Sequence, residues 1–324
     1  MIDTKLIFQN NMNILYNIMS YSIFKERYHL CLTTMNLFNY MFKKYKHNEI
    51  IKIKYNDYKL SEIWDNIMFE MDLTNSRTID VSMLHKIHIL NLTCSVDITD
   101  VSMLSNVNTL NLSHCNGIRD VSSLHNVRNL NLSFCDGITD VSALSNVYNL
   151  NLSYCFGITD VSMLSNVYIL DLSYCENITD LSFSGNCLHE SSKNIIKWKC
   201  HILNLSWCRN ITDLSMFSNV YNLILKDCSK ITDISSLNNV SVIDLSYCSN
   251  IKDISVLCNA HTIKLTYCRN ITDVSPLCNV FSLDIRGCRN ITNVSMLGNV
   301  KKLYLKSCCN IPYKQIIELN KTVE

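Results

Sequence analysis

Seventeen cysteines are the residues with the greatest capacity for chemistry in this chain. A cysteine that binds zinc, acts as a nucleophile or joins a disulfide framework needs a particular spacing or neighbourhood. No two cysteines form a CxxC pair, and Cys308 and Cys309 are merely adjacent, so the spacing of zinc ligands is missing. We interpret the recurring cysteines as small buried hydrophobic residues with a weak S–H donor. Ten of them occupy one position of a repeated segment: Cys115, Cys135, Cys155, Cys175, Cys208, Cys228, Cys248, Cys268, Cys288 and Cys308.

The other reactive side chains also lack a catalytic arrangement. The sequence contains no Gly-rich phosphate loop, HExxH or GxSxG motif, and its nine histidines are scattered. A residue that recurs in every copy of a repeat is poorly suited to be a unique nucleophile or base. We therefore predict a protein that is not an enzyme and that holds no cofactor and no metal.

Aspartate and asparagine columns are better explained by local structure. Asp100, Asp120, Asp140 and Asp160 each precede a short DVSxLSN segment, where aspartate suits the N-cap of one helical or 3₁₀ turn. The asparagine of each SNV triplet is expected to take the left-handed conformation that ends this turn. These asparagines are Asn106, Asn126, Asn146, Asn166, Asn219, Asn239, Asn259, Asn279 and Asn299.

Composition excludes several classes of partner. The net charge of +1, from 29 basic and 28 acidic residues, favours neither nucleic acid nor an anionic membrane. Hydrophobic residues reach 48% without a long apolar run, so no transmembrane helix is expected. The opening MIDTKLIFQNNMN lacks the pattern of a secretory signal. We expect the protein to reside in a reducing cytoplasm.

Pairs of leucine or isoleucine mark a repeat with a period of 20 residues. The pairs begin at Leu90/Leu92 and end at Leu303/Leu305, giving eleven rungs with one insertion of 13 residues near 181–200. The LxL alternation predicts a strand with one buried face. Seven inward residues per rung at roughly 2 kcal/mol each cannot offset roughly 20–40 kcal/mol of backbone entropy, so the rungs must stack. In one copy the seven are Leu150, Leu152, Cys155, Ile158, Val161, Leu164 and Val167.

These residues carry a family resemblance over roughly 78–311. The pattern LxxLxLxxCxxITD, as in 147–160, resembles the cysteine-containing leucine-rich repeat. The ITDVSxL segment is also similar to the bacterial internalin-type repeat, which favours asparagine where this chain has cysteine. The resemblance implies an α/β fold, a right-handed leucine-rich-repeat solenoid with a parallel sheet along its inner face.

The two ends depart from the repeat. Residues 312–324 are expected to form a C-terminal capping helix, with Pro312 at its first helical position and apolar Ile316, Ile317 and Leu319. Residues 1–45 are apolar at helical spacings and resemble a degenerate F-box; a plain helical cap is the equal alternative. Residues 46–77 are expected to be a linker and N-terminal cap. By the resemblance, the ligase-docking residues would be Leu15, Ile18, Tyr21, Leu30, Met35 and Phe38.

Function is expected on the surface where the copies differ from one another. The variable positions lie on the outer side of the predicted strands or at their edges, and include two columns of aromatic residues. Stacking between rungs and anchoring of a partner are both open readings of these columns. The predicted partner-binding residues are Tyr148, Tyr154, Tyr168, Tyr174, Trp207, Tyr221, Lys226, Asp227, Tyr247, Lys264, Tyr267 and Arg286.

Three functions follow from these features. An F-box-like head before cysteine-type repeats resembles F-box/leucine-rich-repeat proteins, and the phrasing of the repeats resembles families encoded by large DNA viruses. The leading hypothesis is therefore an adaptor that binds a protein substrate on its inner face and the linker subunit of a cullin-type ubiquitin ligase at its head. The alternative is a free-standing repeat protein that captures or masks a host protein in the host cytoplasm. A third possibility, a secreted adhesin of internalin type, predicts export and disulfides.

Overall fold

The computed structural model describes residues 50–54, 68–75, 81–84, 87–179 and 198–319. Contacts within the chain divide it into two units, residues 1–49 and residues 50–324. The expected F-box-like module at 1–45, with Leu15, Ile18, Tyr21, Leu30, Met35 and Phe38, lies outside the described residues. Most of the insertion at 181–200 lies outside them as well.

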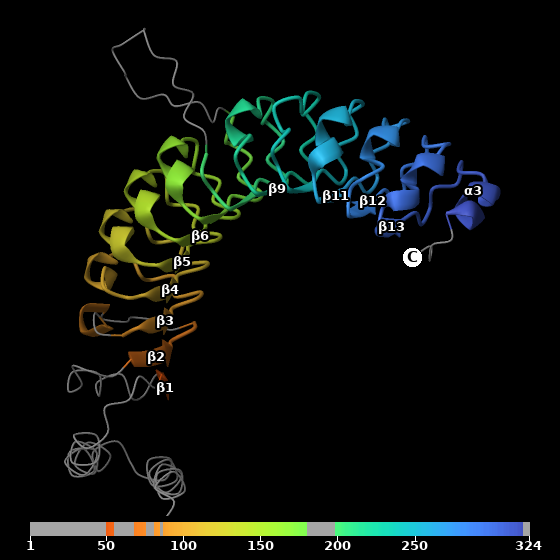
Figure 1. Ribbon diagram of the computed structural model, residues 1–324. Coiled ribbons are helices and arrows are strands. Elements are labelled where there is room, and N and C mark those ends of the chain that lie inside the picture. The colour runs from red at the N-terminus through yellow and green to blue at the C-terminus, as the bar shows by residue number, and fades with distance from the viewer. Residues whose placement is uncertain (1–49, 55–67, 76–80, 85–86, 180–197, 320–324) are drawn as a thin grey trace, which may run out of the picture. The chain divides into compact units, whose positions relative to one another are not determined.

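One parallel sheet runs through the second unit, with its thirteen strands in sequence order (Figure 1). Strands β3 to β13 are the eleven predicted rungs. Strands β1 (Ile50–Lys54) and β2 (Met68–Asp72) precede residue 78, so the sheet begins two strands earlier than the leucine pattern indicates. The others are β3 (Ile89–Asn91), β4 (Thr109–Asn111), β5 (Asn129–Asn131), β6 (Asn149–Asn151), β7 (Ile169–Asp171), β8 (Ile202–Asn204), β9 (Asn222–Ile224), β10 (Val242–Asp244), β11 (Thr262–Lys264), β12 (Ser282–Asp284) and β13 (Lys302–Tyr304).

The register of the sheet confirms the leucine stack. Leu130 pairs with Leu110 on one side and with Leu150 on the other, and Leu150 pairs with Leu170. The pairing continues across the insertion, where Leu170 is opposite Leu203. The inserted residues therefore leave the ladder between neighbouring rungs intact.

The core is the predicted set of seven inward residues per rung. In the rung that begins at β6, each of these side chains has an exposed fraction of 1% or less. Their burial in every interior copy explains the fixed period, because a side chain displaced by one position would leave the core. The seven are Leu150, Leu152, Cys155, Ile158, Val161, Leu164 and Val167.

Short 3₁₀ helices form the side opposite the sheet (Figure 1). Before η5, the Asp140 carboxylate accepts a hydrogen bond of 2.9 Å from the backbone N–H of Ser142. The N-cap residue is Val141, so the capping carboxylate lies one residue earlier than expected. These helices are η2 (Val81–Leu84), η3 (Ser102–Leu104), η4 (Ser122–Asn126), η5 (Ser142–Asn146), η6 (Ser162–Asn166), η7 (Ser215–Phe217), η8 (Ser255–Asn259), η9 (Ser275–Leu277) and η10 (Ser295–Asn299).

The left-handed backbone position lies elsewhere than predicted. The expectation that the SNV asparagines take positive φ is wrong, since none of the nine does so. Positive φ occurs instead just before each cysteine, as at Tyr154 with φ of 60°. There the N–H of Cys155 donates to the carbonyl of Leu152 at 3.2 Å, which closes a four-residue turn. A turn with positive φ at its third residue is a type II turn, so this slot must be left-handed.

The cysteine column forms a ladder of thiol hydrogen bonds. The Cys155 thiol donates to the carbonyl oxygen of Leu132 in the preceding rung, with an S···O distance of 3.1 Å. All ten repeat cysteines make the equivalent contact at 2.9–3.2 Å. Ser95 occupies the same slot in an earlier rung, and its buried hydroxyl donates to the carbonyl of Leu73 at 3.3 Å. The column is therefore structural.

The core is rebuilt next to the insertion. Trp198 is fully buried and packs edge-on against Phe217, with ring centroids 5.6 Å apart. The end of the inserted segment therefore contributes to the core.

A short helix closes the C-terminal end of the sheet. Helix α3 spans Tyr313–Glu318, and Pro312 is its N-cap residue, one position before the expected one. Ile316 and Leu319 pack against the core as expected, whereas Ile317 is 59% exposed. Within the described part of the chain, no helix has the length and apolar character needed to cross a membrane.

Candidate functional site

Two aromatic columns border the outer side of the sheet. We name the residues immediately before each strand the leading column, and the left-handed residues before each cysteine the trailing column. The leading column contains Tyr148, Tyr168, His201, Tyr221, His261 and Phe281, and the trailing column contains His114, Phe134, Tyr154, Tyr174, Trp207, Tyr247 and Tyr267. Because neighbouring strands are in register, each column runs across the strands from rung to rung.

Rings of the leading column stack on one another. Tyr148 and Tyr168 have centroids 4.8 Å apart, and His201 lies 4.9 Å from Tyr168 and 4.6 Å from Tyr221. The guanidinium of Arg128 covers the free face of Tyr148 at 5.0 Å. Sequence reasoning identified the tyrosines and missed His201, although the period of the repeat places it in the same slot.

Rings of the trailing column stack more closely. Centroid distances are 4.2 Å from His114 to Phe134, 4.2 Å from Phe134 to Tyr154 and 4.1 Å from Tyr154 to Tyr174. Trp207 follows at 5.1 Å from Tyr174. A left-handed residue with a side chain costs roughly 1–2 kcal/mol, and each aromatic pair returns roughly 0.5–1.5 kcal/mol beyond its buried area. Stacking on two neighbours therefore offsets the backbone cost.

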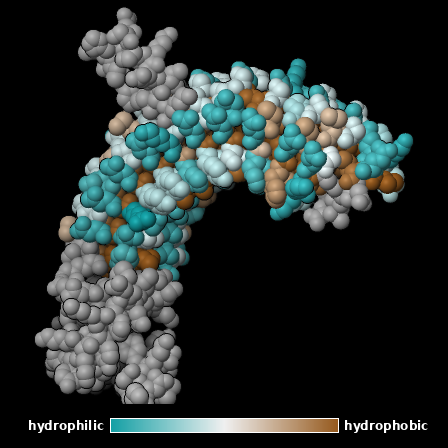
Figure 2. All heavy atoms as spheres, in the orientation of Figure 1, coloured by the Kyte–Doolittle hydropathy of each residue, from teal (hydrophilic) through white to brown (hydrophobic). Residues whose placement is uncertain are grey.

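The stacked rings present their edges to solvent. Tyr148, Tyr168 and Tyr221 are 40%, 38% and 48% exposed although a neighbouring ring or guanidinium covers their faces. Figure 2 shows tan and brown residues scattered among hydrophilic ones on the face in view, with no single large hydrophobic patch. This surface suits contact with ring edges and hydroxyl groups, whereas insertion of a flat ligand between the rings would break the stack.

Between the columns, a row of asparagine and aspartate side chains shapes the end of each strand. In β6 the Oδ1 atom of Asn151 accepts a hydrogen bond of 2.9 Å from the N–H of Ser153. Asp171 makes the same contact with Ser173 at 2.9 Å. One oxygen of each such side chain is thus engaged in forming the turn, and Ile224 is a position where the row is interrupted.

The charged residues predicted to select a partner all have partners within the chain. Asp227 interrupts the trailing column and pairs with Arg209 at 2.7 Å, while the Arg209 guanidinium lies 4.7 Å from the Trp207 ring. Lys264 lies 3.8 Å from Asp244, and Arg286 lies 2.6 Å from the buried Asp284. Lys226 sits over the ring of Tyr247 at 5.5 Å.

The buried thiols are poor nucleophiles. Burial raises the pKa of Cys155 to about 12 and the pKa of Cys208 to about 12, so both remain protonated at neutral pH. All cysteines in the described segments are free thiols. Across those segments, no group of three or more His, Cys, Asp or Glu side chains is placed to hold a metal ion.

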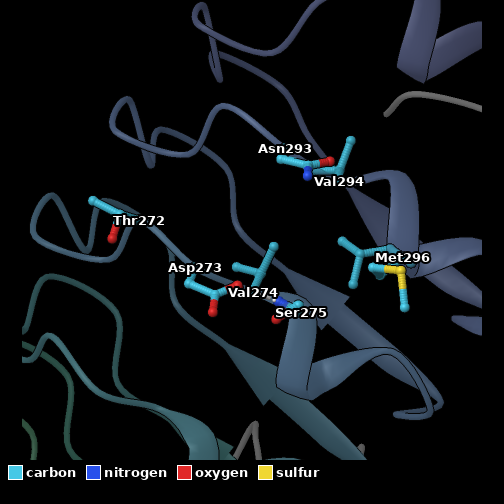
Figure 3. Close-up of a pocket in the computed structure, with 8 residues that line it drawn as sticks. Thr272, Asp273, Val274, Ser275, Asn293, Val294 and Met296 are labelled. Carbon is cyan, nitrogen blue, oxygen red and sulfur yellow. Dashed lines mark hydrogen bonds between the residues drawn. The ribbon is translucent and has the colours of Figure 1, made fainter.

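A small pocket between two rungs offers little room for a ligand (Figure 3). Its volume is about 110 Å³, whereas ligand pockets usually hold roughly 300–1,000 Å³. Asp273 lines it, and one of its carboxylate oxygens already accepts the N–H of Ser275 at 2.8 Å. Asn293 serves Ser295 in the same way at 3.0 Å. The polar atoms of this pocket therefore act as helix caps.

Comparisons with known proteins show the fold. The sequence matches no protein-family model and no curated protein. Among solved structures, an internalin (inlF) of Listeria monocytogenes is similar with a TM-score of 0.57 and 22% identity, covering 76% of this chain and 80% of that chain. A domain of InlJ from the same species, described as including a cysteine ladder, has 16% identity, covers 76% and 64% of the two chains and gives a TM-score of 0.40. A leucine-rich-repeat protein of Leptospira interrogans has 12% identity, covers 86% and 99% and gives a TM-score of 0.37. The second unit of the chain is a leucine-rich-repeat solenoid.

Proposed function

We propose that this solenoid is a non-enzymatic protein-binding scaffold, and that its partner lies on the sheet side. The observation that carries this proposal is the leading column, where Tyr148, Tyr168 and Tyr221 are exposed yet held in a stack. Tyrosine and tryptophan are enriched at protein interfaces because a rigid ring gives a large contact at little entropic cost. A ring held by its neighbours loses still less freedom on binding.

The size of the surface supports the same proposal. Strands about 4.8 Å apart give eleven rungs a length of roughly 50 Å. A specific protein interface needs about 800 Å² from each partner, which a strip of this length and roughly 16 Å width supplies. A small molecule would need a concave pocket, and the grooves described above are too small for one.

Site-specific photo-crosslinking in cells tests this proposal. A photoreactive phenylalanine analogue replaces Tyr148 or Tyr168 on the sheet side, and Met103 or Met163 on the opposite side in control variants. The two methionines are 45% and 46% exposed, so accessibility is matched. The proposal expects one defined set of partner adducts from the tyrosine positions alone. Equal adducts from both sides, or none from the tyrosine positions, would contradict it.

The compartment forms part of the same proposal. A cytoplasmic scaffold, in the host cytoplasm if the chain is viral, is expected to keep its cysteines reduced, and the free thiols described above support this. Alkylation of the protein under denaturing conditions, directly on cell lysis, should modify every cysteine without prior reduction. Cysteines that need a reductant before they react would favour an exported adhesin instead.

Ligase recruitment is the finer proposal, and it rests on the sequence of residues 1–45 alone. Purified linker subunit of a cullin-type ligase should bind the full-length chain, and Leu30→Asp or Phe38→Asp should abolish this binding. Lack of binding by the intact chain would leave the free-standing scaffold, with the head as a cap, as the function.

A further inference from the structure

Charge on the sheet side changes sign along the solenoid. Each rung contributes a ten-residue segment to this side, from the leading column to the second residue after the cysteine. In the first five complete rungs, from 88–97 to 168–177, these segments carry Arg128 against four acidic residues. In the last five, from 221–230 to 301–310, they carry nine cations against three carboxylates. The whole chain has a net charge of only +1, so composition alone conceals this asymmetry.

We name the nine cations of the last five rungs the basic strip. All nine are exposed, whereas Asp227 and Asp244 are half-buried and Asp284 is buried. Seven of them form no ion pair with any residue in the described segments; Lys264 and Arg286 are the paired members. Charge accessible to a partner is therefore positive. The strip consists of Lys226, Lys230, Lys264, Arg269, Arg286, Arg289, Lys301, Lys302 and Lys306.

Ring contacts place the strip beside the aromatic columns. The guanidinium of Arg286 lies 5.6 Å from the Tyr304 ring, and the ammonium of Lys302 lies 5.7 Å from the Phe281 ring. Arg269 and Arg289 occupy the slot that Arg209 occupies in an earlier rung, where its guanidinium covers Trp207. The cations and the ring edges thus form one continuous surface over β9 to β13.

Building on the proposed scaffold function, we propose that this surface binds an acidic segment of a partner protein. Opposite charge steers association and fixes register, while ring edges supply apolar contact. Nucleic acid fits the surface less well, because proteins hold single strands by stacking bases on free aromatic faces. Here the facing sides of Tyr247 and Tyr267 cover each other at 5.0 Å, and the backbone of Gly287 lies against the Tyr267 ring.

The repeat itself supplies the substitutions for a test. Serine stands at residues 229 and 249 in the slot of Arg269 and Arg289, and Ser246 stands in the slot of Lys306. The triple variant Arg269→Ser, Arg289→Ser, Lys306→Ser therefore uses residues that this fold already accepts. A charge-conserving triple variant, Arg269→Lys, Arg289→Lys, Lys306→Arg, is the matched control.

Fluorescence anisotropy of the full chain with a labelled twelve-residue peptide, half glutamate and half serine, measures the interaction. The inference expects binding that weakens as NaCl rises from 50 to 300 mM, by about tenfold or more. The serine variant should weaken binding by about tenfold, and the charge-conserving variant should stay within about twofold of the parent chain.

Two outcomes overturn the inference. One is absence of peptide binding at 50 mM NaCl, or equal affinity in the parent chain and the serine variant. The other is tighter binding of single-stranded DNA of equal charge than of the peptide. Photo-crosslinking at Tyr148 and Tyr168 reports on a different part of the sheet side, so the scaffold proposal can survive either result.

Discussion

Replacement of Gly287 by alanine is expected to loosen the last rungs of the solenoid. Gly287 holds the left-handed slot of its rung, with φ of 72°. A Cβ atom there would lie 2.6 Å from Cδ1 and from Cε1 of Tyr267. The left-handed backbone costs alanine roughly 1–2 kcal/mol, and overpacking adds roughly 1–3 kcal/mol. Lower entropy of the unfolded chain returns roughly 0.4–1 kcal/mol, so the net loss should be about 2–3 kcal/mol.

Thiol exchange at Cys288 is the assay with the best spatial resolution. This cysteine is fully buried next to the substituted residue, and burial raises its pKa to about 12, so only opening of the rung exposes it to reagent. A loss of about 2–3 kcal/mol should raise its labelling rate roughly 30- to 150-fold. Gly298→Ala is the control, because a Cβ atom at Gly298 would have nothing within 4 Å.

A double-mutant cycle separates the two causes of this loss. In a Tyr267→Ser background the contact with the ring disappears, so Gly287→Ala should cost only about 1 kcal/mol, from the backbone conformation. Serine is compatible with the slot, since Ser307 has φ of 65° there. Equal costs in the two backgrounds, or equal effects of Gly287→Ala and Gly298→Ala, would refute the reasoning.

The remaining predictions concern the columns of cysteine and aspartate. Cys155→Ser keeps a donor to the neighbouring carbonyl, so in urea unfolding it should cost about 1 kcal/mol less than Cys155→Ala; the reverse order would mean that the slot is purely hydrophobic. The Ser122 N–H holds the pKa of Asp120 below its usual value, so stability should be present above pH 4 and decline as pH falls through the lowered pKa. Asparagine at the capping aspartates, as at Asn293, should flatten this decline in thermal midpoint, and an unchanged decline would count against it. Under native conditions, peptide mass spectrometry should find Cys258 and Cys309 alkylated before any of the ten ladder cysteines.

Sequence periodicity predicted the core because every copy reports the same physical constraint. Leu130, Leu150 and Leu170 face identical neighbours, so their agreement identifies the buried face without any structure. The insertion was also visible, since the leucine pairs resume in phase after it at Leu203. Strands β1 and β2 were missed because their residues lack the LxL spacing of the later copies.

The left-handed slot was misplaced because intrinsic preference pointed to asparagine. Tyr154 and Tyr174 take positive φ against their own preference, since stacking between rungs offsets the cost. A usable signal was present in Asp227 and Gly287, which stand in the same column and tolerate this conformation more readily than aromatic residues do. Pairing of Arg286 with Asp284 had no such signal, because two side chains two residues apart meet only when the strand end bends back.

Uniform register has a consequence for how such a chain changes in evolution. Residues 118–137 and 158–177 each meet the rung between them through the same leucine pairing. Removal of 138–157 by recombination between similar coding segments would bring two compatible edges together, and duplication would add one more. The length available to a partner can therefore grow or shrink in steps of roughly 4.8 Å without redesign of the interior.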